Sequence, residues 1–246
     1  MKHLKKLITL ALFIAAGSGF TVANTKGTVA ENKIIRADDE RQVSGFSGIT
    51  ISGRHNVYIT MGNTESLRLE GDATAINEIE TKVEDGVLKI RNKKQMNTRS
   101  WNNTGKVNIY IQAKSLNNLV LSGSGNVEVN GKVKSANLSN TISGSGSIEV
   151  TMEVENYSAV ISGSGEISAK GYAKNAKIAI AGSGDFDGHN LKTSIANAKV
   201  SGSGDVSIIA DKQLDAVVSG SGDIRYSGNA AVNSTKSGSG NISRGL

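Results

Sequence analysis

The sequence contains no cysteine, so disulfide bonds cannot stabilise the fold and we expect no lipid-anchored N-terminus. Stability must therefore come from apolar burial and backbone pairing. Positive charge is scattered, and Lys2, Lys5 and Lys6 alone account for half of the net charge of +6. This distribution does not match a nucleic-acid-binding surface.

The N-terminal residues predict export. The basic residues Lys2, Lys5 and Lys6 precede an apolar run of ten residues, Leu7 to Ala16, and small or polar residues follow as far as Asn24. This order is typical of a secretory signal peptide, and ten apolar residues are too few to cross a bilayer as a helix. We therefore predict a signal peptide over 1–23, a periplasmic or surface location, and no transmembrane span in the mature chain.

A Gly-Ser-Gly motif recurs seven times in the second half of the chain. The copies begin 18 to 21 residues apart, at Ser122, Ser143, Ser162, Ala181, Ser201, Ser219 and Ser237. A fixed period near twenty residues indicates stacked structural units, each of which buries its apolar face on its neighbours.

Apolar residues alternate on both sides of each motif. Ala176, Ile178 and Ile180 precede one copy, and Ile224 and Tyr226 follow another. A period of two predicts strands, and no helical pattern separates the copies. We therefore predict an all-β parallel β-helix, or β-solenoid, with 18–21 residues per coil. We expect right-handed winding, because parallel crossovers favour that hand. The positions after the motif should form one buried stack, comprising Val127, Ile148, Ile167, Val206 and Ile224.

The motif itself has two structural interpretations. With unbroken pleating, both glycines point inward, and the serines and the residue after the motif point outward. Alternatively, the motif is a tight corner at which glycine supplies a positive φ. A phosphate-binding loop needs a helix after the glycines, and the pattern predicts none. In the last coil, Lys236 and Arg244 replace apolar residues, so we expect this coil to cap the stack with both side chains exposed.

The first half of the mature chain is less regular. We predict a flexible segment over 24–42, an irregular solenoid part over 43–121, and the regular repeats over 122–246. Strands are expected around Leu67–Leu69, Val87–Ile90 and Val107–Ile111. Asp72 to Glu80 predicts one short helix that begins at an Asp72 cap.

Three segments of the chain together resemble a known family. They are FSGITISGRHNVYITMGNTESLRLEGDATAINEIETKVEDGVLKI, WNNTGKVNIYIQAKSLNNLVLSGSGNV and the reiterated SGSGD. In this order they are similar to the head GIN domain family, a bacterial domain of unknown function labelled as an auto-transporter adhesin. The resemblance covers about Val43 to Leu246. It implies a β-helical fold and an exported, surface-associated role, and it implies no catalytic residues.

Asp185, Asp205 and Asp223 occupy one position of the repeat and predict an outward ladder of carboxylates. Such a ladder is a candidate for calcium or, by analogy with β-helical enzymes, for glycan cleavage. The alternative is that Asp and Asn satisfy backbone groups at a turn. Asp187 and His189 follow at alternate positions and, with Asp185, form a candidate site for a transition metal. His55 lies in a degenerate copy of the motif, and we expect it to be a turn residue.

The segment from Asn92 to Gly105 is polar and aperiodic and predicts an excursion loop. Trp101 on this loop, with Tyr110 and the cations Lys93, Lys94 and Arg99, is the best candidate for ligand recognition. The alternative is that Trp101 covers the apolar edge of the solenoid.

These features favour a non-enzymatic structural or adhesive module that binds a glycan or a protein at the cell envelope. We expect no cofactor, and the oligomeric state is left open. The competing hypotheses are a calcium-binding solenoid and a carbohydrate-active enzyme.

Overall fold

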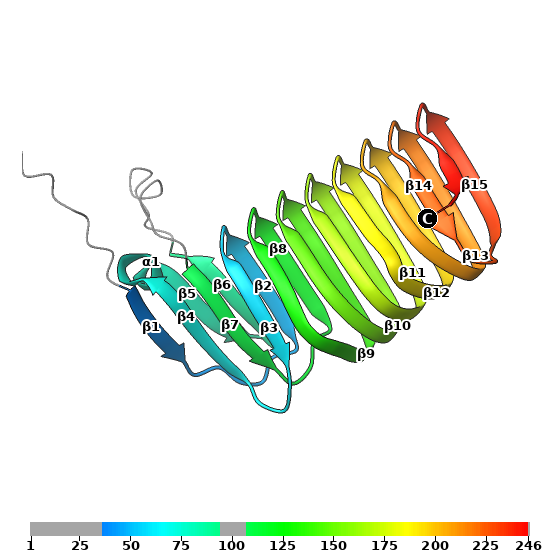
Figure 1. Ribbon diagram of the computed structural model, residues 1–246. Helices are drawn as coiled ribbons and strands as arrows, with labels where there is room; N and C mark the ends of the chain where they lie inside the picture. The colour runs from blue at the N-terminus through cyan, green and yellow to red at the C-terminus, as the bar shows by residue number, and fades with distance from the viewer. Residues whose placement is uncertain (1–35, 94–106, 246) are drawn as a thin grey trace, which may run out of the picture. The chain divides into compact units, whose positions relative to one another are not determined.

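The computed structural model describes residues 36–93 and 107–245. Within these ranges the chain forms stacked coils of β-strands and one short helix, which confirms the predicted β-solenoid (Figure 1). No helix in this part of the chain is long and apolar enough to cross a membrane.

Long strands that bend around the coil form the regular part of the solenoid. Consecutive long strands pair in parallel along nearly their whole length, so that Gly144, Gly163 and Gly182 lie side by side. The strands of this part are β9 (Asn126–Gly144), β10 (Ser147–Gly163), β11 (Glu166–Gly182), β12 (Asp185–Gly202), β13 (Val206–Gly220), β14 (Ile224–Ser227), β15 (Ala231–Gly238) and β16 (Ile242–Arg244).

Each coil contributes to two faces. Segments that follow a motif pair with one another and form the post-motif face, and segments that precede a motif form the pre-motif face. Alternate side chains point inward and meet their counterparts in the next coil. The predicted stack is confirmed: it is continuous and buried, and Phe186 completes it between Ile167 and Val206.

Both glycines of the motif lie too close to the neighbouring coil to carry a side chain, and the first has a conformational reason as well. The first lies at a corner with positive φ, as at Gly163 (φ +121°) and Gly182 (φ +125°), so the corner interpretation applies to it. The second is buried against the neighbouring coil: a Cβ on Gly184 would lie 2.4 Å from the Gly165 carbonyl oxygen. Any side chain at the second position would therefore push neighbouring coils apart.

The N-terminal part contains both parallel and antiparallel strands. Its elements are β1 (Arg36–Arg41), β2 (Gly48–Gly53), β3 (Asn56–Met61), β4 (Ser66–Asp72), α1 (Ala73–Asn77), β5 (Ile79–Glu84), β6 (Val87–Asn92), β7 (Val107–Ala113) and β8 (Asn118–Gly123). Strands β2, β3, β6, β7 and β8 continue the parallel coils, whereas β1, β4 and β5 pair antiparallel to their neighbours. Strand β1 falls inside the segment 24–42 that the sequence predicts to be flexible.

The coils of this part do not stack in the order of the sequence. On the post-motif face the strands run β1–β4–β7–β3–β9, and on the pre-motif face β6 lies on one side of β2 and β8 on the other. Strands β2 and β3 therefore form a coil that has β4 to β7 on one side, and β8 and β9 on the other. The helix between β4 and β5 is shorter than expected. Asp72 caps it through the Ala75 N–H, and it ends at Asn77.

The last described coil confirms the predicted cap. Lys236 pairs in register with the buried Val218, and all eight residues of β15 are exposed. Arg244 is also exposed, and its guanidinium donates to the Gly228 carbonyl oxygen at 2.7 Å. Charged side chains thus end the apolar stack at its solvated end.

Candidate functional site

The acidic ladder binds the backbone of the next coil. The Asp205 N–H donates to Asp185 Oδ1, the Asp223 N–H to Asp205 Oδ1 and the Asn241 N–H to Asp223 Oδ1, each at 2.9 Å. The remaining carboxylate oxygens of Asp205 and Asp223 accept from Arg225, at 3.4 and 2.9 Å. These contacts support the turn interpretation of the repeated Asp and Asn.

Asp187 and His189 contact each other, as their spacing predicts. Asp187 Oδ1 lies 2.6 Å from His189 Nδ1 and accepts the His189 N–H at 3.1 Å. Desolvation alone would raise the pKa of Asp187, but these hydrogen bonds hold it below its ordinary value. Asp185 instead accepts from the next coil. Among the described residues, no three ligating side chains gather into a metal-sized cluster.

Most of the predicted recognition loop lies outside the described residues, including Lys94, Arg99 and Trp101. Lys93 is described, and its ammonium donates to the Asn77 carbonyl oxygen at the end of α1. Tyr110, the aromatic residue that the sequence groups with this loop, lies on the post-motif face in β7.

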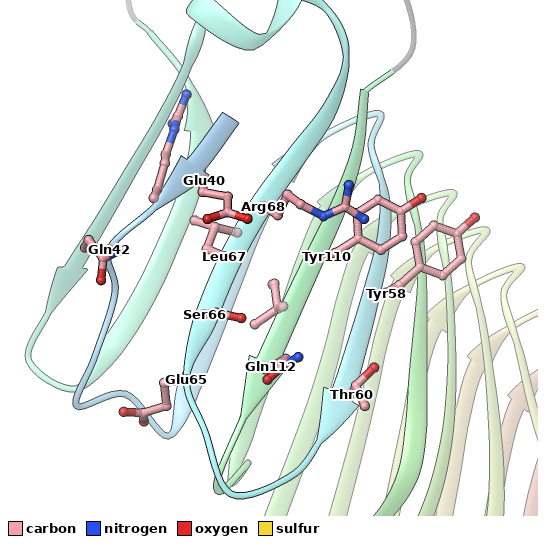
Figure 2. Close-up of a pocket in the computed structure, with 12 residues that line it drawn as sticks. Glu40, Gln42, Tyr58, Thr60, Glu65, Ser66, Leu67, Arg68, Tyr110 and Gln112 are labelled. Atoms are coloured by element: carbon pink, nitrogen blue, oxygen red, sulfur yellow. The ribbon is translucent and has the colours of Figure 1, made fainter. Parts of the chain in front are cut away.

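An aromatic pair on the post-motif face is the main feature that sequence reasoning missed. Tyr58 on β3 and Tyr110 on β7 are register partners, and their rings stack with centroids 5.3 Å apart and planes at 18°. Antiparallel β4 places Arg68 opposite Tyr110, with its guanidinium carbon 4.3 Å from the ring centroid. Figure 2 shows the resulting row of Arg68, Tyr110 and Tyr58.

The cation of this row is already paired. The Arg68 guanidinium contacts Asp38 at 3.2 Å and Glu70 at 3.3 Å. Desolvation by itself would lower the pKa of Arg68, but the two carboxylates raise it. Arg68 therefore supports the Tyr110 ring, and its charge is balanced within the protein.

Two hollows lie beside the aromatic pair: both tyrosines line the first, and Tyr58 also lines the second. The first hollow has a volume of about 380 Å³, and its polar lining includes Glu40, Gln42, Thr60, Glu65, Ser66 and Gln112 (Figure 2). The second has a volume of about 300 Å³ and is lined by Asn56, Asn126, Glu128, Ser147 and Glu149 beside Tyr58 and Val127. We call the two hollows together the tyrosine groove.

Several lining groups are held in place by hydrogen bonds. Ser147 donates to Asn126 Oδ1 at 3.0 Å, and the Gly45 N–H donates to Glu65 at 3.1 Å. Glu149 forms an ion pair with Lys170 at 2.5 Å. The groove thus offers carboxylate, amide and hydroxyl groups around an aromatic platform, which suits a hydroxylated ligand.

The sequence carried a signal for this site. Val57-Tyr58-Ile59 and Ile109-Tyr110-Ile111 each place a tyrosine between two buried aliphatic residues, hence on the outer face of a strand. Their adjacency depends on the order in which the coils stack.

The chain matches a family model and is similar to several solved structures. A family model described as "Putative auto-transporter adhesin, head GIN domain" matches residues 45–230. No curated protein matches the chain. A "putative adhesin" from Bacteroides fragilis has a similar crystal structure, with a TM-score of 0.78 and 24% identity over 85% of this chain and 97% of that one.

Two structures from Parabacteroides distasonis are also similar, both with a TM-score of 0.71. One is described as a "putative lipid binding protein" and is 27% identical over 86% of this chain and 97% of that one. The other is described as a "putative adhesin" and is 23% identical over 86% of this chain and 98% of that one.

Proposed function

The chain belongs to the head GIN domain family, and from this premise we propose that it is a non-enzymatic adhesion module that binds a glycan at the cell envelope through the tyrosine groove. The stacked Tyr58 and Tyr110 carry this proposal. They lie on an outward sheet face, where they have no part in the apolar core, and they line a polar hollow. The C–H-rich face of a sugar ring packs on an aromatic ring, while its hydroxyls bond to the polar groups around it.

The names of the relatives support an adhesive role. The matching family model and two of the three structures above are described as adhesins. One structure is described as lipid-binding, but the amide, hydroxyl and carboxylate lining of the tyrosine groove suits a hydroxylated ligand better than an acyl chain. Export is supported by the order of residues in the segment 1–23.

The contacts of the acidic ladder weigh against the calcium and enzyme hypotheses. A calcium site uses several carboxylate oxygens on one ion, whereas Asp205 and Asp223 direct their oxygens to a backbone N–H and to Arg225. Glycoside hydrolysis needs two carboxyl groups with different roles, and these two aspartates have equivalent surroundings.

A glycan array with the chain from residue 24 onward tests the proposal. We expect binding to at least one oligosaccharide, and a loss of about fivefold in affinity for Tyr58→Ala, because an aromatic contact contributes about 1 kcal/mol. Tyr172→Ala is the matched control, since Tyr172 is an exposed tyrosine on β11 outside the groove. A protein that binds no glycan, or whose binding is indifferent to Tyr58→Ala, would contradict the proposal.

A further inference from the structure

Resting on this proposed function, we propose that the tyrosine groove selects an uncharged, linear glycan that runs along the stacking axis, and that it rejects anionic glycans. Two features support this proposal: the hollows adjoin at Tyr58, and carboxylates are among the groups that line them.

The two hollows adjoin at Tyr58, which lines both, and together they form a track across neighbouring strands. Tyr58 has the Tyr110 ring on one side, and its register partner on the other side is Glu128 of the second hollow. Most lining residues come from β1, β4, β7, β3, β9 and β10, which are consecutive neighbours in the sheet. Six strands at the usual spacing span about 24 Å. This track suits an oligosaccharide, whereas a single sugar ring would fill only one hollow.

The track presents an excess of negative charge to a ligand. Four carboxylates line it, those of Glu40, Glu65, Glu128 and Glu149. Glu65 and Glu149 form ion pairs with Lys114 and Lys170. Glu40 and Glu128 form no ion pair with any described residue and face a ligand with their full charge. The two cations that line the track, Arg41 and Arg68, are both engaged within the protein.

Arg41 forms an ion pair with Asp39 at 2.9 Å and also donates to the Ile79 carbonyl oxygen at 2.8 Å. Arg68 binds Asp38 and Glu70. An anionic sugar would therefore meet carboxylates without a free guanidinium to pair with, and like charges brought together weaken binding.

Uncharged hydroxyls complement the same lining. A carboxylate accepts hydrogen bonds from sugar hydroxyls, and the amide of Gln42 and the hydroxyls of Thr60 and Ser66 can both donate and accept. Glu128 lies beside Tyr58 at the shared wall of the two hollows, so it is the carboxylate that we expect to contribute most to discrimination.

The test uses an array of gluco-, manno- and galacto-hexasaccharides, each paired with its form oxidised at C6 to a uronate. The members of a pair differ only in their carboxylates. We expect the neutral member of any bound pair to bind at least tenfold more tightly at low salt, and the preference to shrink as salt screens the charges. Disaccharides of the bound series should bind at least tenfold more weakly than the hexasaccharide.

Two substitutions make the assignment specific. Glu128→Gln should reduce the preference for the neutral member several-fold. Glu166→Gln, an exposed glutamate on the same face outside both hollows, should leave the preference unchanged. A uronate that binds as well as its neutral partner, or a disaccharide that binds as well as a hexasaccharide, overturns this inference while leaving glycan binding intact. An array on which nothing binds overturns the proposed function as well.

Discussion

Replacing Gly204 with alanine should destabilise the solenoid at an inner coil. A Cβ on Gly204 would lie 1.9 Å from the Gly184 carbonyl oxygen, whereas such contacts are essentially never below 3.0 Å. The φ of Gly204 lies outside the left-handed region, so the alanine backbone itself is not strained. The whole effect must therefore come from the close approach of two coils.

The size of the effect follows from the hydrogen bonds at this corner. Relieving the clash requires the two coils to separate locally by about 1 Å. This movement would break the bonds from the Ser203 N–H to Gly182 O and from the Phe186 N–H to Asp205 O, both 2.8 Å long. Two lost backbone bonds in a packed corner cost about 2–4 kcal/mol. For a domain of this size the melting temperature should fall by about 5–15 °C.

Gly240→Ala is the matched control, measured by circular dichroism or calorimetry. The same Cβ would lie 2.0 Å from the Gly222 carbonyl oxygen, but Gly240 belongs to the last described coil, which can move outward. Its loss should be less than half as large, and the exposed Ser203→Ala should change little. Equal losses for Gly204→Ala and Gly240→Ala, or no loss for either, would refute the reasoning.

Three further predictions concern the ladder, a buried histidine and the cap. Asp205→Ala should lower the free energy of unfolding by about 1 kcal/mol, because it loses the bond from the Asp223 N–H. Asp205→Asn keeps an acceptor and should change stability little. Thermal melts with and without Ca²⁺ would contradict this if Asp205→Asn lost a calcium-dependent stabilisation. Burial lowers the pKa of His55 from 6.5, so the unfolded chain binds the proton more readily and stability should fall as pH drops from 7 to 5. Urea midpoints at both pH values should show a smaller fall for His55→Gln, and an identical fall would exclude His55 as a cause. Lys236→Val should leave the melting temperature nearly unchanged but increase self-association in sedimentation velocity, because a charge on an edge strand opposes pairing with another chain. A variant that self-associates no more than the parent would contradict this.

The regular half of the fold could be predicted from the sequence because its information is local and repeated. Alternation in every coil assigns Val127, Ile148 and Ile167 to the interior, and the shared period places them in one stack. The cap at Lys236 followed from the same register, since a charge stands where an inner coil has Val218. The two interpretations of the glycines could not be separated, because φ and the distance between coils are properties of the assembled corner.

The site depended on tertiary structure. Tyr58, Arg68 and Tyr110 meet only because β7 inserts between β3 and the antiparallel β4. Periodicity assigns each side chain to the outer face of a strand, but it does not specify which strands become neighbours when the coils stack out of order. Likewise, the repeat predicts that Asp205 and Asp223 lie in one row. The structure adds that a backbone N–H of the next coil points at each carboxylate, so that the carboxylates link neighbouring coils. Sequence alone thus determined what repeats along the solenoid, and the tertiary structure decided which side chains meet across it, because the order in which coils stack depends on contacts between distant segments.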